Sequence, residues 1–163
     1  MLRAECAWPA TPQSVRGARE FVQSQLQEWA AEELIWPAIT VVSELTTNAV
    51  LHARTEFAVE LVLAGGKLQV RVGDKSPHHP VRRRYDDDAA TGRGLALLEA
   101  LTTDWGVTAT DDGKVVWCVV EASEEWRSGA SHETSVEDAP APFGDSADLD
   151  GFGGGAACLA YAA

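Results

Sequence analysis

Two pairs of strand-like segments, each joined by a short turn, are the feature that most limits how this chain can fold. Apolar and polar side chains alternate on either side of Gly65-Gly66, in residues 55–64 and 68–72. Residues 105–121 repeat this arrangement around Asp111-Asp112-Gly113. Parallel strands need a crossover helix between them, so both pairs are predicted to be antiparallel hairpins.

Helical segments stand between and before these hairpins. Apolar residues recur at helical spacing over residues 14–30, just after Thr11-Pro12, which supplies a helix start. A second helical segment follows and ends at about residue 53, and a third spans residues 94–103. Residues 1–10 are consistent with a short edge strand. This order predicts an α+β two-layer sandwich, with a mainly antiparallel or mixed sheet and helices on one face.

The second helix carries polar side chains at a regular spacing. Glu44, Asn48 and His52 are four residues apart, which places them on one helical face beside an apolar stripe. An Asn oxygen can bind a hard cation such as Mg²⁺, and a neighbouring Glu can accept a proton from an attacking hydroxyl. By itself the pattern also fits a solvated helix surface.

Two further segments carry candidate binding residues. Asp74 ends the second alternating segment, where its carboxylate can meet the end of the Glu44 helix, although a turn-forming Asp before Pro77 has the same pattern. Gly92-Arg93-Gly94 opens the third helix, and free N–H groups at a helix N-terminus favour phosphate. A single Gly-x-Gly before a helix is also common in purely structural positions.

Charge and cysteine content exclude several classes of function. The net charge is −12, and residues 122–163 hold eight acids and one base, which leaves −5 for residues 1–121. Direct nucleic-acid binding is not expected, because it needs clustered Lys and Arg. Cys6, Cys118 and Cys158 have neither zinc-site nor disulfide-framework spacing, so we expect reduced thiols. Without a long apolar run, a soluble cytoplasmic protein with no membrane partner is expected.

The composition changes after residue 121. Residues 122–163 are rich in Ser, Asp, Glu, Ala, Pro and Gly. Such a segment buries too little apolar surface to offset its ordering entropy. We therefore predict a folded domain over residues 1–121 and a disordered acidic tail over residues 122–163.

Three segments in this order resemble the nucleotide-binding boxes of the GHKL (histidine-kinase-like, Bergerat-type) ATP-binding fold. They are Glu44 to Ala49, Gly73 to Pro77 and Thr91 to Leu95, and the resemblance spans about residues 7–121. Within that fold the chain is similar to the anti-sigma-factor serine/threonine kinases and their small actinomycete relatives. The resemblance implies Mg²⁺ and ATP as cofactor and substrate.

Roles follow from the resemblance residue by residue. Asn48 would bind Mg²⁺, Glu44 would be the general base and Asp74 would accept the exocyclic amine of adenine. The phosphate loop would contain Thr91, Gly92, Arg93 and Gly94, with His52 on the phosphate side. The sequence departs from the family pattern at Lys75-Ser76-Pro77, which replaces a glycine-containing continuation, and at Val115-Val116-Trp117, where many relatives have a Thr near adenine.

The resemblance implies partners as well. The expected substrate is a serine of an anti-anti-sigma (STAS-type) protein, which would compete with a sigma factor for a kinase that is commonly a homodimer. Sensor histidine kinases usually have Asn at the position of Glu44 and need a phospho-acceptor hairpin that the preceding 33 residues do not provide. Two alternatives stay open: a non-catalytic interaction module of the same fold, with or without ATP, and simple ATP hydrolysis.

Overall fold

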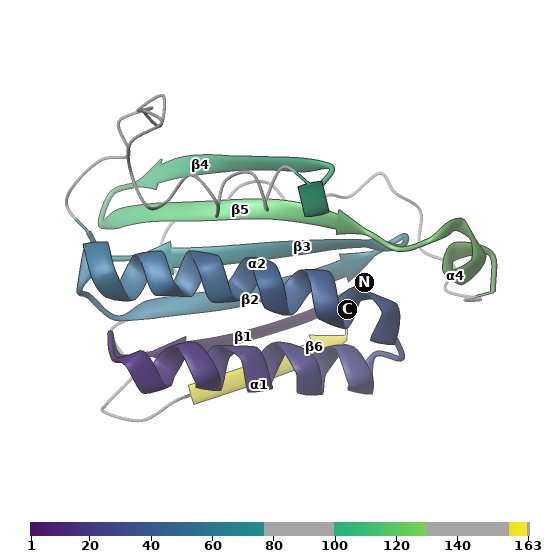
Figure 1. Cartoon of the computed structure of the whole chain (residues 1–163), viewed down its shortest axis with the longest axis horizontal. Coiled ribbons are helices and arrows are strands. Elements are labelled where there is room, and N and C mark those ends of the chain that lie inside the picture. The colour runs from purple at the N-terminus through teal and green to yellow at the C-terminus, as the bar shows by residue number, and fades with distance from the viewer. Residues whose placement is uncertain (77–99, 130–156, 163) are drawn as a thin grey trace.

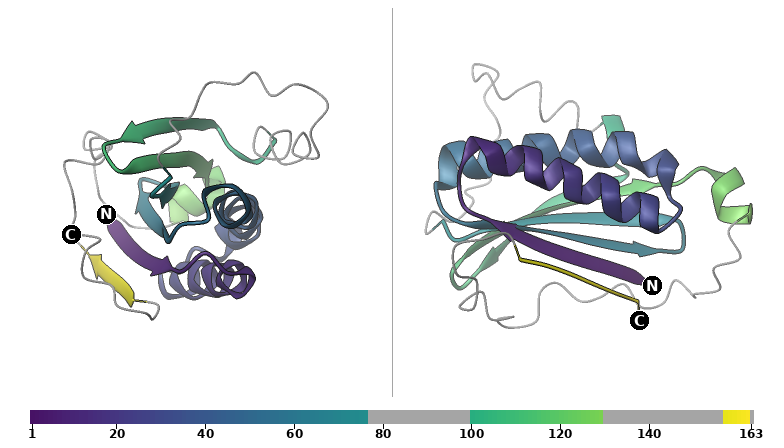
Figure 2. Two further views of the ribbon diagram at one scale, coloured as in Figure 1. Left: turned by 90° about the vertical axis from the view of Figure 1, so that its left-hand side faces the viewer. Right: turned by 90° about the horizontal axis from the view of Figure 1, so that it is seen from below.

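A six-stranded sheet with helices on one face forms the structure, a computed structural model that describes residues 1–76 and 100–129 and the backbone of residues 157–162 (Figures 1 and 2). The strands are β1 (Leu2–Trp8), β2 (Phe57–Ala64), β3 (Lys67–Asp74), β4 (Asp104–Thr110), β5 (Gly113–Glu121) and β6 (Ala157–Ala162). Their order across the sheet is β4-β5-β3-β2-β1-β6, and every neighbouring pair is antiparallel. The predicted α+β two-layer architecture is confirmed.

The helices of the structure are α1 (Pro12–Glu28), a 3₁₀ turn (Glu32–Leu34), α2 (Ile35–Asn48), a π-helical turn (Ala49–Ala53) and α4 (Glu124–Gly129). The first two predicted helices are confirmed, α4 was not predicted, and most of the third predicted helix, residues 94–103, lies outside the described residues. Thr11 occupies the N-cap position of α1 with an extended backbone and Pro12 follows it, as predicted. The Thr11 hydroxyl does not cap the helix, because it lies 2.8 Å from the Ser14 hydroxyl instead.

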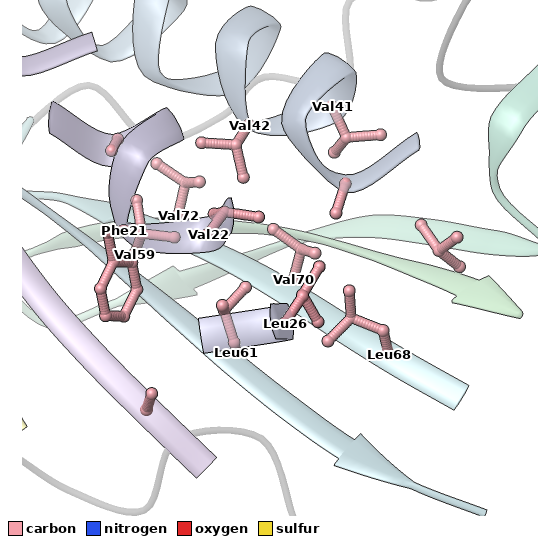
Figure 3. Close-up of a cluster of buried hydrophobic side chains, with 14 of the residues drawn as sticks. Phe21, Val22, Leu26, Val41, Val42, Val59, Leu61, Leu68, Val70 and Val72 are labelled. Carbon is pink, nitrogen blue, oxygen red and sulfur yellow. The ribbon is translucent and has the colours of Figure 1, made fainter. Parts of the chain in front are cut away.

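The core lies between the two long helices and the sheet (Figure 3). Side chains from α1, α2, β2 and β3 interlock there, including Phe21, Val22, Leu26, Val41, Val42, Val59, Leu61, Leu68, Val70 and Val72. The run Glu32–Ala53 is long and apolar enough to cross a membrane by length and composition alone. Its apolar face is in contact with the sheet, which is the position of a core helix.

Cross-strand register places one row of residues at the end of the sheet where β3 finishes. Trp8 lies opposite Phe57, Phe57 opposite Asp74, and Asp74 opposite Lys114. Trp8 and Phe57 stack with ring centroids 5.9 Å apart. At the other end of β3, Gly65 and Gly66 have φ angles of 55° and 75°, which a tight hairpin turn requires. The row is thus apolar on one side of Asp74 and cationic on the other.

The prediction of a disordered tail over residues 122–163 is wrong for two segments. Helix α4 begins just after β5 and is held to the α1–α2 connection, since the Trp126 indole N–H donates to the Ala30 carbonyl at 3.1 Å and the Ser123 hydroxyl lies 2.8 Å from Glu33. Strand β6 pairs with β1. The composition of this segment does not predict α4 or β6, because both are held by contacts with residues that are distant in the sequence.

The expectation of three reduced thiols is also wrong, because Cys6 is disulfide-bonded. Cys118 is a free, buried thiol, and the residue opposite Cys6 in the β1–β6 register is Cys158. The sequence gives no sign of this because the two residues stand 152 positions apart (158 minus 6). Only the pairing of the first and last strands brings their backbones together.

Candidate functional site

The position of Glu44 and Asn48 follows from how α2 packs. Buried Ala38, Val41, Val42 and Leu45 fix one face of the helix against the sheet. Glu44 and Asn48 flank this buried stripe and are partly exposed. A carboxylate and a carboxamide one turn apart are therefore partly exposed beside the buried face of the helix.

The last turn of this helix has an unusual geometry. Ala49–Ala53 is π-helical, with the Arg54 N–H donating to the Ala49 carbonyl at 3.1 Å, and Arg54 then takes a left-handed conformation with φ 56°. Single π turns are frequent at functional sites. His52 lies in this wider turn and is exposed, so it does not continue the α-helical face that carries Glu44 and Asn48.

Asp74 is the last residue of β3 and lies at the end of the molecule where α2 finishes. In Figure 1 the carboxyl end of α2 and the carboxyl end of β3 lie at the same end of the sheet, and α2 packs on β3. Asp74 is 8% exposed. Its Oδ1 accepts a hydrogen bond from the Ser76 N–H at 3.0 Å, and its Oδ2 lies 3.7 Å from the Lys114 Nζ.

Burial controls the ionisation of Asp74. Desolvation raises the pKa of its carboxyl above the ordinary 3.8, while the Ser76 N–H and the Lys114 ammonium act in the opposite direction. Phe57, which is 1% exposed and lies opposite Asp74 in β2, is part of the apolar surroundings that cause the desolvation. A buried carboxylate with a nearby cation is suited to forming hydrogen bonds with the polar edge of a ligand.

Two backbone contacts hold the chain around this carboxylate. The Lys75 N–H donates to the Thr55 hydroxyl at 3.1 Å, which ties the end of β3 to the segment after the π-helical turn. A Cβ built on Gly113 would lie 1.9 Å from the Asp74 carbonyl oxygen, so only glycine permits this approach of β5. Three segments thus meet at Asp74 and keep it at one position.

The remaining predicted site residues lie outside the described residues. These are the predicted phosphate-loop residues Thr91, Gly92, Arg93 and Gly94. The structure therefore brings the carboxyl end of α2, where Asn48 is the last residue, to the same end of the sheet as Asp74, and it does not describe the phosphate loop. Glu44 lies one turn earlier on α2.

The donor set fits Mg²⁺ held through a nucleotide rather than by protein alone. Within residues 1–76 and 100–129, no three His, Cys, Asp or Glu side chains gather into a metal site. Mg²⁺ usually keeps several waters and takes one or two protein ligands together with substrate phosphates. Asn48, partly exposed at the site, can be such a single ligand.

Sequence reasoning missed three contributors to the site: Lys114, Thr55 and Ser76. The signal for Ser76 was available in part, because an Asp followed two residues later by a free N–H commonly forms this turn. Its contact uses only the backbone, so loss of the family's glycine pattern at Lys75-Ser76-Pro77 does not remove it. Lys114 needed knowledge of the β3–β5 register.

Comparison with protein families gives one match that covers most of the chain. The model of the histidine kinase-like ATPase domain matches residues 8–120 of the 163. The chain belongs to this family. Comparison with curated proteins gives no match. The matched range includes α2 and Asp74, so the domain is an ATP-binding domain of the GHKL type and the expected fold is correct.

Proposed function

We propose that this protein is an ATP-dependent serine kinase of the anti-sigma type, which phosphorylates a serine of a STAS-type anti-anti-sigma partner and so controls a sigma factor. The observation that carries the proposal is the pairing of Glu44 with Asn48 on α2 in a histidine kinase-like ATPase domain. A domain that only binds nucleotide needs no general base one turn before the Mg²⁺ ligand.

The proposed chemistry assigns one task to each described residue. Asp74 accepts a hydrogen bond from the base of ATP, and Asn48 offers its side-chain oxygen to Mg²⁺. Mg²⁺, when bound, neutralises charge on the phosphate oxygens. Glu44 accepts the proton of the attacking serine hydroxyl. The serine oxygen forms a bond to the γ-phosphorus, the bond from that phosphorus to the β–γ bridging oxygen breaks, and ADP leaves.

The test compares three variants in two assays. Isothermal titration of Mg²⁺-ATP reports binding, and transfer of radiolabelled γ-phosphate to purified STAS-domain proteins of the same organism reports catalysis. Glu44→Gln should keep ATP binding and lower transfer by about 10²–10⁴-fold. Asn48→Ala should abolish transfer while the circular dichroism spectrum stays unchanged. Glu28→Gln, an exposed position at the end of α1, is the matched control and should behave as wild type.

A non-catalytic interaction module of the same fold is the second candidate. The observation that favours it is that Asp74 already has two partners within the chain, the Ser76 N–H and the Lys114 ammonium. In that case the wild type would bind a STAS partner without any phosphate transfer. Phosphate release without a protein acceptor, lost in Glu44→Gln, would instead indicate simple ATP hydrolysis. Transfer retained in Asn48→Ala would contradict the kinase assignment.

A further inference from the structure

Lys114 is placed beside Asp74 by the sheet itself. The two residues are direct cross-strand partners in the β3–β5 register, and the Lys114 Nζ lies 3.7 Å from the Asp74 Oδ2. Both side chains are sheltered, with 22% of the Lys114 side chain and 4% of the Asp74 side chain exposed. A lysine this close to the end of a strand normally extends into water, so its position next to a buried carboxylate needs an explanation.

The backbone around Lys114 keeps it in this place. At Gly113, the preceding residue, a Cβ would collide with the Asp74 and Lys75 backbone, so no side chain fits there. On the other strand, the Ser76 N–H occupies the Oδ1 atom of Asp74 and leaves Oδ2 directed toward Lys114. The site therefore offers one acceptor and one donor side by side.

The spacing of the two groups leaves both able to bind a ligand. At 3.7 Å the ammonium and the carboxylate form an ion pair, but they are farther apart than the 2.7–3.2 Å of an N–H···O hydrogen bond. The three donors of the ammonium and the second oxygen of Asp74 are thus not saturated by each other. A ligand edge with a donor next to an acceptor complements this pair.

We propose that Lys114 is a base-reading residue, which donates a hydrogen bond to N1 of the adenine ring while Asp74 accepts one from the neighbouring exocyclic amine. The proposal rests on the nucleotide site proposed above. In adenine the exocyclic amine is a donor and the adjacent N1 is an acceptor, so the edge presents the complementary pattern. Lys114 thus supplies a donor on β5, the strand in which many relatives carry a Thr and this chain has Val115-Val116-Trp117.

The test combines one substitution with one altered ligand. Lys114→Met keeps most of the side-chain volume and removes the donors, and 1-deaza-ATP replaces N1 of the base by a C–H group. Wild-type protein should bind ATP about tenfold more tightly than 1-deaza-ATP, as expected for one hydrogen bond to a charged donor. Lys114→Met should lose about tenfold in ATP affinity and bind both nucleotides equally.

Lys67→Met is the matched control. Lys67 also lies in this sheet and pairs with a carboxylate, that of Glu121 at 3.1 Å, but it stands at the opposite end of β3. This variant should keep the wild-type preference for ATP. The proposal is overturned if Lys114→Met binds ATP as tightly as wild type, or more tightly, or keeps the preference. Absence of ATP binding by wild-type protein would instead overturn the proposed function.

Discussion

At the scale of single residues, Asp74 shows how a binding role opposes stability. Its carboxyl is buried beside Phe57, and desolvation raises its pKa above 3.8. The folded protein therefore holds the Asp74 proton at a pH where the unfolded chain has lost it. From about pH 3.8 up through the raised pKa, this residue makes the fold less stable as pH rises, and the loss persists at neutral pH.

Substitution of Asp74 should separate the two effects. Asp74→Asn removes the buried charge, so we expect the variant to unfold in urea at neutral pH at a denaturant concentration no lower than wild type. Its ATP affinity should fall by about tenfold or more, because the amide is a weaker acceptor for the exocyclic amine. Urea unfolding across pH 3.5 to 7 and isothermal titration measure the two quantities. A variant that is less stable than wild type at neutral pH would contradict the assigned cause of the pKa shift.

At the scale of secondary-structure elements, the approach of β5 to the end of β3 depends on Gly113. A Cβ at this position would lie 1.9 Å from the Asp74 carbonyl oxygen and 2.9 Å from the Lys75 Cα. Both atoms are backbone, so the strands must separate to admit it. We expect Gly113→Ala to lower the free energy of unfolding by about 1–3 kcal/mol and to weaken ATP binding, because Lys114 and Asp74 move apart.

Gly73→Ala provides the matched comparison for this prediction. A Cβ there would meet only a Val115 methyl group at 3.6 Å and the Lys114 carbonyl oxygen at 3.9 Å, which are ordinary contacts. Thermal unfolding of both variants should therefore show a loss for Gly113→Ala and little change for Gly73→Ala. Equal losses of thermal stability would mean that any added side chain at this end of the sheet is destabilising. The close approach of the backbone at Gly113 would then not be the cause.

The elements also show which parts of the structure a sequence can predict. The hairpin at Gly65-Gly66 and the α2 helix follow from local alternation and helical spacing, and both were predicted. The placement of Asp74 at a strand end near α2 was predicted for the same reason. The pairing of Lys114 with Asp74, by contrast, depends on the β3–β5 register, which no local pattern determines. The π-helical turn that carries His52 likewise has no sequence signature that we recognise.

At the scale of the whole molecule, β6 covers the outer edge of the sheet. Strand β1 would otherwise present unpaired N–H and C=O groups along its free side, which is a template for association with other chains. The antiparallel register places the start of β1 beside the end of β6, with Leu2 opposite Ala162. Cys6 of β1 is disulfide-bonded, and Cys158 of β6 is the residue opposite it in the register. The end of the chain is thus part of the same sheet as the nucleotide site.

Thiol counting tests this arrangement. The chain has three cysteines, and burial raises the pKa of the Cys118 thiol to about 12, so alkylation of native protein at pH 8 should be slow. In denaturant without reductant one thiol per chain should react, and three should react after reduction. Peptide mapping should find Cys6 joined to Cys158.

Cys6→Ser should lower the free energy of unfolding by about 2–4 kcal/mol and speed hydrogen exchange along β1, because the cross-link that closes the chain is lost. Three reactive thiols without reductant would contradict the disulfide and remove the covalent link between the two ends of the chain.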